Sequence, residues 1–260
     1  MIEDKIIIIK NLSKYFLLNN KIKWVIKDIN MEIKEGEFIV ILGPGGCGKS
    51  TFLKILCGIE NQSSGTIILK GRKFEKNKSH DIYKKFGFVF QNSNLLPWRT
   101  AEKNLSIVLE IQKLESQKWK SRIDEMLDIV GLSAYKKMFP HELSGGMQQR
   151  LSIARALVNN PKILLMDQPL GSLDAITRKI LGLELLKIWE KTKKTIIMVT
   201  NNVDEAILLG TRIFVFTSLP ANIKDEVEVN IPFEEKDSNI ISNKRYNEIH
   251  KYLSRVIRSI

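Results

Sequence analysis

The stretch GPGGCGKST, residues 43–51, decides the fold; it follows the apolar run FIVILG and opens a helical stretch. It fits the spacing G-x-x-x-x-G-K-[ST], in which a strand passes through a glycine-rich turn into a helix. The glycines let successive backbone N–H groups converge on phosphate oxygens, and the start of the helix adds positive potential. We expect Lys49 to reach the β- and γ-phosphates and the Ser50 hydroxyl to coordinate Mg²⁺. The stretch therefore predicts a phosphate-binding loop.

Short apolar runs alternate with amphipathic stretches along most of the chain. FIVILG, KILLMD, TIIMVT and RIFVFT are typical of buried parallel strands between helices. The opening stretches KIIIIKNLSKYF and WVIKDINMEIKEGE indicate antiparallel strands instead, with a turn at Glu35 and Gly36. We expect an α/β fold with a mostly parallel sheet and an antiparallel β subdomain.

Strand-like runs stop between about residue 93 and residue 158, where AEKNLSIVLEIQKL, WKSRIDEMLDIVGL and SGGMQQRLSIARALV all have helical periodicity. We interpret this region as an inserted helical subdomain. The predicted organisation is an α/β core with its antiparallel β subdomain at 1–92 and 159–217, a helical subdomain at 93–158, and a C-terminal strand and helical tail at 218–260. The tail helix could pack on the domain or lie near a membrane.

Composition limits the classes of protein that the chain can belong to. Its 260 residues suffice for one large α/β domain, and no apolar run approaches the roughly 20 residues of a membrane-spanning helix. No charged-then-apolar leader opens the chain. Cys47 and Cys57 lack metal-type spacing, which indicates reduced thiols in a cytosolic protein. The net charge of +12 comes from scattered lysines; it suits a solvated basic surface, nucleic-acid binding or attraction to an anionic membrane.

Two further motifs have the chemistry of a nucleotide site. KILLMD brings Asp167 to the C-terminal end of a strand, where it can hold Mg²⁺ directly or through water. LSGGMQQR, residues 143–150, starts a helix that Ser144 can cap, and Gly145 and Gly146 expose backbone N–H groups to an anion. If the two phosphate-binding helix starts lie far apart, two chains facing head to tail would complete both sites.

These motifs, in this order, resemble the ATP-binding-cassette (ABC) family over almost the whole chain, which implies a P-loop NTPase (RecA-like) fold with ATP and Mg²⁺ as cofactors. GPGGCGKST resembles its Walker A motif, LSGGMQQR its signature, KILLMD its Walker B strand and GSLD its D-loop. FGFVFQ is similar to the Q-loop strand, which implies that Gln91 contacts Mg²⁺ and senses a transmembrane partner. Phe16 stands at the aromatic position that stacks on adenine, with Tyr15 as the second choice.

The resemblance implies a set of site residues in three roles. The implied nucleotide-binding residues are Phe16, Tyr15, Gly43, Gly45, Gly46, Cys47, Gly48, Lys49, Ser50, Thr51, Gln91, Ser144, Gly145, Gly146, Gln148 and Asp174. The implied metal ligands are Ser50, Gln91 and Asp167, and the positions of catalytic residues are held by Lys49, Gln168 and Asn201.

Narrower features are similar to the ATPase subunits of nitrate, taurine, aliphatic-sulfonate and bicarbonate importers: LLPWRTAEKNL, PHELSGGMQQR, LDAITR and VDEA. The resemblance implies two ATP-binding subunits docked under two transmembrane permease subunits, at the cytoplasmic face of the inner membrane. An extracytoplasmic solute-binding protein would deliver a small anionic or organic solute. Leu96, Pro97 and Trp98 would border the groove for a permease subunit, although Trp98 could instead be core packing. No nucleic-acid partner is expected.

The chain departs from the family pattern where hydrolysis takes place. The family has Glu after the Walker B aspartate, where this chain has Gln168. After the next strand the family has His and then Asp, in VTHD, where this chain has Asn201 and Asn202, in VTNN. A carboxamide is not a base near neutral pH, and a general base typically contributes roughly 10²–10⁴-fold. Gln can still orient a water, so slow turnover is compatible with the sequence. Gly45, where relatives usually have Ser, still satisfies the phosphate-loop spacing.

The sequence predicts a site that binds Mg-ATP tightly and hydrolyses it poorly, which leaves several alternatives. Gln168 could be an engineered substitution; the chain could be the degenerate half of a heterodimer whose intact LSGGMQQR completes a partner's site; or it could form a slow homodimer. The alternative functions are a soluble ABC protein acting as a nucleotide-gated clamp on nucleic acid or ribosomes, and a regulatory ATP-binding module without a transport role.

Overall fold

The N-terminal region forms an antiparallel sheet in a computed structural model that describes residues 5–73, 85–112, 119–171, 173–237 and 239–260. Its strand order is β2-β1-β4-β5, with β1 at Lys5–Leu18, β2 at Lys21–Lys34, β4 at Ser64–Leu69 and β5 at Arg72–Lys73. Asn19 and Asn20 join β1 to β2 and both have positive φ, as the tight turn of a twisted hairpin requires. The predicted antiparallel strands and the turn at Glu35 and Gly36 are confirmed.

The central sheet has six strands in the order β10-β9-β3-β8-β7-β6. The strands are β3 (Phe38–Leu42), β6 (Phe86–Val89), β7 (Ile163–Asp167), β8 (Thr195–Thr200), β9 (Arg212–Phe216) and β10 (Ile223–Glu228). All pairs are parallel except β9 with β10. Every residue of β3 and β8 is buried, which explains their unbroken apolar sequences. The predicted α/β fold with a mostly parallel sheet is confirmed.

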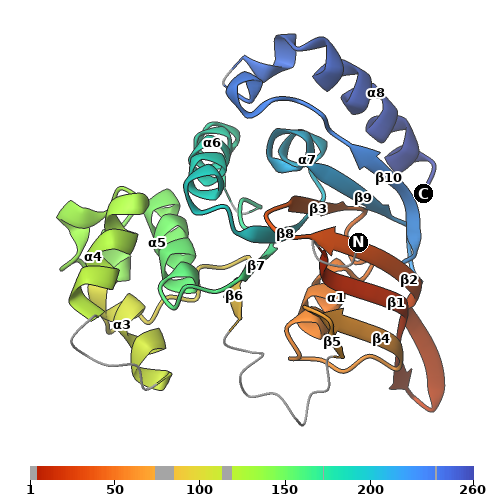
Figure 1. Ribbon diagram of the computed structural model, residues 1–260, viewed down its shortest axis with the longest axis horizontal. Coiled ribbons are helices and arrows are strands. Elements are labelled where there is room, and N and C mark those ends of the chain that lie inside the picture. Colours follow the sequence, from red (N-terminus) through yellow and green to blue (C-terminus); the bar gives the residue numbers. More distant parts are fainter. Residues whose placement is uncertain (1–4, 74–84, 113–118, 172, 238) are drawn as a thin grey trace.

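Two hydrophobic cores lie on the two faces of this sheet, and β3 contributes to both. Phe38, Val40 and Leu42 belong to one core, whereas Ile39 and Ile41 belong to the other. The first core packs under α6 (Ala175–Thr192), α7 (Val203–Leu209) and α8 (Lys244–Arg258); the second packs under α1 (Lys49–Leu56) and the antiparallel sheet (Figure 1). The alternation of side chains along a strand thus places the phosphate-binding turn between two packed layers.

Three helices form a group at one end of the molecule: α3 (Ala101–Ile111), α4 (Trp119–Ile129) and α5 (Gly145–Leu157) (Figure 1). Short 3₁₀ helices at Ser133–Tyr135 and Pro140–Glu142 connect α4 to α5. The side chain of Ser144 caps α5 by accepting a hydrogen bond from the backbone N–H of Met147, as predicted. We retain residues 93–158 as a proposed helical subdomain.

The C-terminal part returns to the core through β10, 3₁₀ turns at Phe233–Glu235 and Ile240–Ser242, and α8. The tail helix packs on the domain, beside α7, and buries Tyr246, Ile249 and Leu253 (Figure 1). Within the ranges described, no helix is both long and apolar enough to cross a bilayer.

Candidate nucleotide-binding site

The phosphate-binding turn leaves β3 at Leu42 and enters α1 at Lys49, in the strand–turn–helix context that the sequence predicts. Gly48 has a φ of 111°, and an added Cβ would lie 3.0 Å from the Val25 Cγ1 and 3.1 Å from its carbonyl oxygen. Only glycine fits there. Gly45 has nothing within 4 Å of an added Cβ, so the serine usual among relatives would find space at this position.

Lys49 folds over the turn instead of pointing into solvent. Its ammonium donates hydrogen bonds to the carbonyls of Gly43 (2.8 Å) and Pro44 (2.7 Å), and lies 3.8 Å from the Cys47 Sγ. The side chain is 4% exposed, and burial lowers the pKa of Lys49, an effect that Cys47 and Asp167 partly oppose. A cation buried mainly among neutral carbonyls is a strong attractor for a phosphate group.

The metal-binding prediction rests on Ser50 and Asp167, which the fold brings together from α1 and the end of β7. The Ser50 hydroxyl donates a hydrogen bond of 2.9 Å to the Asp167 carboxylate. Both are hard oxygen donors, as Mg²⁺ requires, and Mg²⁺ usually takes its remaining ligands from water and phosphates. The described residues contain no cluster of three or more His, Cys, Asp or Glu side chains suited to a metal. These two oxygens therefore fit a nucleotide-associated Mg²⁺ better than an all-protein cage.

A cavity of about 500 Å³ opens between the phosphate-binding turn and the β1–β2 hairpin. Its size lies within the range of small-molecule sites. The residues that line it are Phe16, Leu17, Leu18, Lys23, Val25, Gly46, Gly48, Lys49, Ser50, Thr51, Gln168 and Leu219. One wall is apolar and the other is the cationic loop, so the arrangement can hold a flat apolar group and a polyphosphate at once.

Of the two aromatic candidates, only Phe16 lines the cavity. Tyr15 packs edge-on against Trp24 instead, with ring centroids 5.2 Å apart. Gly43, Gly45 and Cys47 belong to the loop but are not among the lining residues. The sequence analysis did not predict five other lining residues: Leu17, Leu18, Lys23, Val25 and Leu219. The first four lie in the β1–β2 hairpin, and the register that the Asn19-Asn20 turn imposes on it was the signal that could have identified them.

The remaining predicted nucleotide contacts lie away from this cavity. Gln91 is exposed and has no hydrogen bond to Ser50 or Asp167 among the described contacts. The Gln148 amide donates to the carbonyls of Pro140 and Leu143, within the helical group.

The predicted residues at the starts of α5 and α6 are also absent from the lining: Ser144, Gly145, Gly146 and Asp174. Asp174 caps α6, and hydrogen bonds from Thr177 and Ile176 lower the pKa of its carboxyl. The structure thus brings together the Walker A and Walker B residues with Phe16 and Gln168. The signature residues face elsewhere. Ser172, in the GSLD motif, lies outside the described residues.

Gln168 has an unusual backbone conformation at the edge of the cavity. Its φ of 44° is left-handed, a conformation that costs a non-glycine residue roughly 1–2 kcal/mol. Its N–H donates to the Val199 carbonyl at 3.0 Å, and its carbonyl accepts from the Gly171 N–H at 3.0 Å. These bonds hold the residue with its side chain on the cavity wall.

Asn201 and Asn202 follow β8 and have different surroundings. Asn201 is exposed, and it is not among the residues that line the cavity. Asn202 caps α7, because its side-chain oxygen accepts a hydrogen bond of 2.9 Å from the Glu205 N–H. Since Asp and Asn cap helices about equally well, the change at Asn202 preserves a structural role. Only the change at Asn201 removes an imidazole without an evident replacement.

The segment predicted to meet a permease subunit projects from the surface. Trp98 is 72% exposed, so the alternative interpretation of core packing is wrong. Asn104, which sequence reasoning missed, is fully buried under this segment. Its amide accepts from the Leu96 N–H and donates to the carbonyls of Leu96, Arg99 and Thr100. The available signal was the position of Asn104 on the same helix face as Ala101 and Leu105, which indicates burial but not its hydrogen-bond partners.

Known proteins resemble this chain over most of its length. The ABC transporter family model matches residues 26–171. The aliphatic sulfonates import ATP-binding protein SsuB of Bacillus cereus is 40% identical over 243 residues, 94% of this chain and 92% of the relative. The taurine import ATP-binding protein TauB of Pelagibacter ubique is 42% identical over 208 residues, 80% of this chain and 76% of the relative.

Two solved structures share the fold. The ATP-binding cassette MJ0796, in a dimeric post-hydrolysis state bound to ADP and Pi, has a TM-score of 0.75 at 33% identity and covers 87% of this chain and 100% of its own. The cassette cbiO1 of Clostridium perfringens, part of the ABC transporter complex cbiONQ, has a TM-score of 0.79 at 27% identity and covers 97% and 100%. With the Walker residues assembled as described, the chain belongs to the ABC transporter family, as an ATP-binding cassette with the P-loop NTPase fold.

Proposed function

We propose that this chain is the ATP-binding, energy-coupling subunit of an importer for a small anionic or organic solute of the sulfonate or taurine type. The named relatives are import ATP-binding proteins, and the chain aligns with most of their length. The observation that carries the proposal is the cavity in which Lys49, Ser50 and Phe16 meet. Its cationic loop binds the triphosphate, and its apolar wall holds the base.

We assign three roles to the residues of the Walker site. Lys49 binds the β- and γ-phosphates, Phe16 stacks on adenine, and Ser50 with Asp167 holds Mg²⁺. When bound, Mg²⁺ supplies a positive charge that offsets negative charge developing on the phosphates. The hydrogen bond between the Ser50 hydroxyl and the Asp167 carboxylate keeps both oxygens at the same point of the cavity edge.

Hydrolysis at this Walker site is slow in our proposal because the water lacks a proton acceptor. Gln168 lines the cavity and can orient a water through its amide, but it cannot take up the proton. Asn201 is too short to hold both a water and the γ-phosphate as an imidazole would. The residues for binding are present, and the residues for rapid turnover are replaced.

A second cassette completes the arrangement. Ser144, Gly145, Gly146, Gln148 and Asp174 lie away from the cavity that holds Lys49, which suits residues that serve a site on a partner chain. MJ0796, similar to this chain, is described as a dimer. The partner is either a second copy or a different cassette that retains Glu and His; in the latter case the signature of this chain completes the partner's competent site.

In our proposal, the complex lies at the cytoplasmic face of a membrane, where the cassettes bind permease subunits through the segment that contains Leu96, Pro97 and Trp98. The 72% exposure of Trp98 supports this docking, because a large exposed aromatic ring is well suited to a protein interface. A solute-binding protein outside the membrane selects the solute.

The test compares the chain with a Gln168→Glu, Asn201→His double variant in single-turnover ATP hydrolysis. We expect the double variant to cleave bound ATP roughly 10²–10⁴-fold faster, with a similar dissociation constant for Mg-ATP. Lys49→Ala is the matched binding control and should weaken nucleotide binding in both backgrounds. Brisk turnover of the unsubstituted chain that the double variant fails to raise would contradict the proposal.

A further inference from the structure

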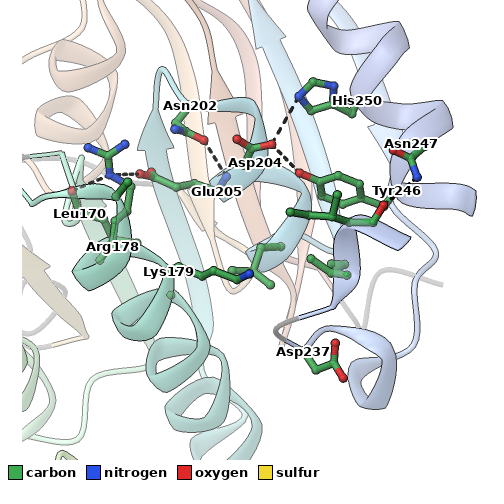
Figure 2. A pocket seen from close by; sticks show the side chains of 15 residues that line it. Leu170, Arg178, Lys179, Asn202, Asp204, Glu205, Asp237, Tyr246, Asn247 and His250 are labelled. Atoms are coloured by element: carbon green, nitrogen blue, oxygen red, sulfur yellow. Dashed lines mark hydrogen bonds and ion pairs between the residues drawn. The ribbon is translucent and has the colours of Figure 1, made fainter. Parts of the chain in front are cut away.

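The first turn of α6 and the start of α7 are joined by Arg178, in LDAITR, and Glu205, in VDEA, neither of which is among the predicted site residues. Arg178 extends from α6 towards the loop that follows Gln168. Its Nη2 donates a hydrogen bond of 2.8 Å to the Leu173 carbonyl, and its Nε donates one of 3.4 Å to the Leu170 carbonyl. The same Nε lies 3.4 Å from the Glu205 Oε1 (Figure 2). One guanidinium thus contacts the D-loop segment and α7 together.

Glu205 continues this connection to the segment that contains Asn201. Its carboxylate accepts a hydrogen bond of 2.6 Å from the Thr200 hydroxyl. Its N–H donates to the Asn202 side chain (Figure 2). The Asn202 N–H in turn donates to the Thr200 hydroxyl oxygen at 3.1 Å. Glu205 therefore holds the residue before Asn201 and the residue after it.

The surroundings of Glu205 favour its ion pair with Arg178. Glu205 is only 6% exposed, and burial raises the pKa of its carboxyl, while the Thr200 hydroxyl and Arg178 act in the opposite direction. A cavity of about 350 Å³, lined in part by Arg178, Asn202 and Glu205, opens beside the pair (Figure 2).

We propose that Arg178 and Glu205 form a positioning bridge that fixes two residues of the D-loop segment, Leu170 and Leu173, relative to the switch segment, residues 200–202. Because Gln168 lies two residues before Leu170 and Asn201 lies within the switch segment, the bridge sets the distance between Gln168, which orients the attacking water in the proposed function, and Asn201, which stands at the family's histidine position. The expected effect on turnover rests on that proposed function. The coupling of the two segments is a structural inference and is independent of the proposed function.

Arginine is required here for its shape as well as its charge. A guanidinium can donate to two carbonyls and pair with a carboxylate at once, because its N–H groups point in fixed, divergent directions. A lysine would keep the ion pair with Glu205 but lose at least one carbonyl of the D-loop segment. Arg178→Lys therefore separates the positional role from the charge.

The test is made in the Gln168→Glu, Asn201→His chain, in which turnover is expected to be measurable. Three single variants are added to this background, Glu205→Gln, Arg178→Lys and Arg178→Met, together with one double variant that combines Arg178→Met with Glu205→Gln. Single-turnover hydrolysis and Mg-ATP binding are measured separately. We expect each single variant to lower the hydrolysis rate at least about tenfold while the dissociation constant changes less than about twofold. Since the two side chains act as one unit, the double variant should be no slower than the slower single variant.

Amide hydrogen exchange of the full chain without nucleotide gives a second readout. Any single variant should speed exchange in both segments, at Leu170, Gly171 and Leu173 in the first and at residues 200–202 in the second, because each segment loses its link to the other. The matched control is Arg245→Met, which breaks an exposed Arg–Glu pair on α8 with Glu248 and should change neither segment. Glu205→Gln keeps the side-chain volume and an oxygen that can accept a hydrogen bond from Thr200. The exchange measurement can therefore be made on this variant if the other variants fold poorly.

Two results would overturn the bridge. One is exchange that rises in only one segment; the other is a double variant whose rate loss is the product of the single losses. If the parent chain binds no Mg-ATP, the proposed function fails, but the exchange measurement still decides whether the two segments are coupled.

Discussion

Replacing Lys236 with methionine should remove a large pH-dependent part of the folding stability. The Lys236 side chain is 7% exposed, and its ammonium donates a 2.6 Å hydrogen bond to the Gly210 carbonyl. Burial lowers the pKa of this amine from its ordinary 10.5 to about 7. In the unfolded chain the amine keeps its proton up to about pH 10.5, so between these two values the unfolded state binds more protons than the folded state. Stability must therefore rise with pH in this window.

The size of the effect follows from the same two values. One proton of difference between the folded and unfolded states changes the free energy of unfolding by about 1.4 kcal/mol per pH unit. The amine is half-protonated in the folded state near pH 7, so the gain between pH 7 and pH 9 is about 2 kcal/mol. Methionine has a similar length and no charge, and it should remove this gain while also removing the hydrogen bond to Gly210, a loss that does not depend on pH.

The assay is urea unfolding without nucleotide at pH 7, 8 and 9, followed by the fluorescence of the four tryptophans. The unsubstituted chain should gain about 2 kcal/mol more than Lys236→Met across this range. Lys224→Met, which removes an exposed lysine on β10, is the matched control and should follow the unsubstituted chain. If the free energy of unfolding changes with pH in parallel for the unsubstituted chain and Lys236→Met, the assignment of a buried Lys236 amine with a lowered pKa is refuted.

Further substitutions, in three sets, test the local structure. Asn104→Ala leaves buried carbonyls without donors and should lower the free energy of unfolding by about 1–3 kcal/mol in urea unfolding; an unchanged midpoint would contradict the buried role. Gly48→Ala should weaken Mg-ATP binding at least about tenfold, because its positive φ strains an alanine and Val25 would crowd the added Cβ. Gly45→Ser should change the dissociation constant little, and equal effects of the two variants would count against the loop geometry. Asn202→Ala should lower stability by about 1 kcal/mol through loss of the α7 cap, and Asn202→Asp should restore it; equal stability of the two variants would rule out capping.

Much of the fold could be predicted because its determinants are local. The buried strands β3, β7 and β8 appear in the sequence as unbroken apolar runs, since both faces of the central sheet are covered. The glycine spacing before Lys49 identifies the turn, because few arrangements other than a strand–turn–helix accommodate it. Helix α8 was also predictable from its apolar periodicity.

The parts that could not be predicted depend on contacts between distant residues. Nothing near Asn104 in the sequence shows that its amide organises the segment that exposes Trp98. The pairing of Arg178 with Glu205 joins two helices across 27 positions and follows only from how α6 and α7 pack. The choice of Phe16 over Tyr15 depends on the side to which each ring turns in β1, which local patterns left open.

The most direct test of slow hydrolysis at an intact binding site is the composition of the bound nucleotide. The purified chain is mixed with radiolabelled Mg-ATP below the concentration of sites, rapidly filtered after a few seconds and after tens of minutes, and the bound ATP and ADP are separated. We predict that nearly all label is bound and that it remains ATP at the later time. Bound label that is mostly ADP after a few seconds, or label that passes through unbound, would contradict the account.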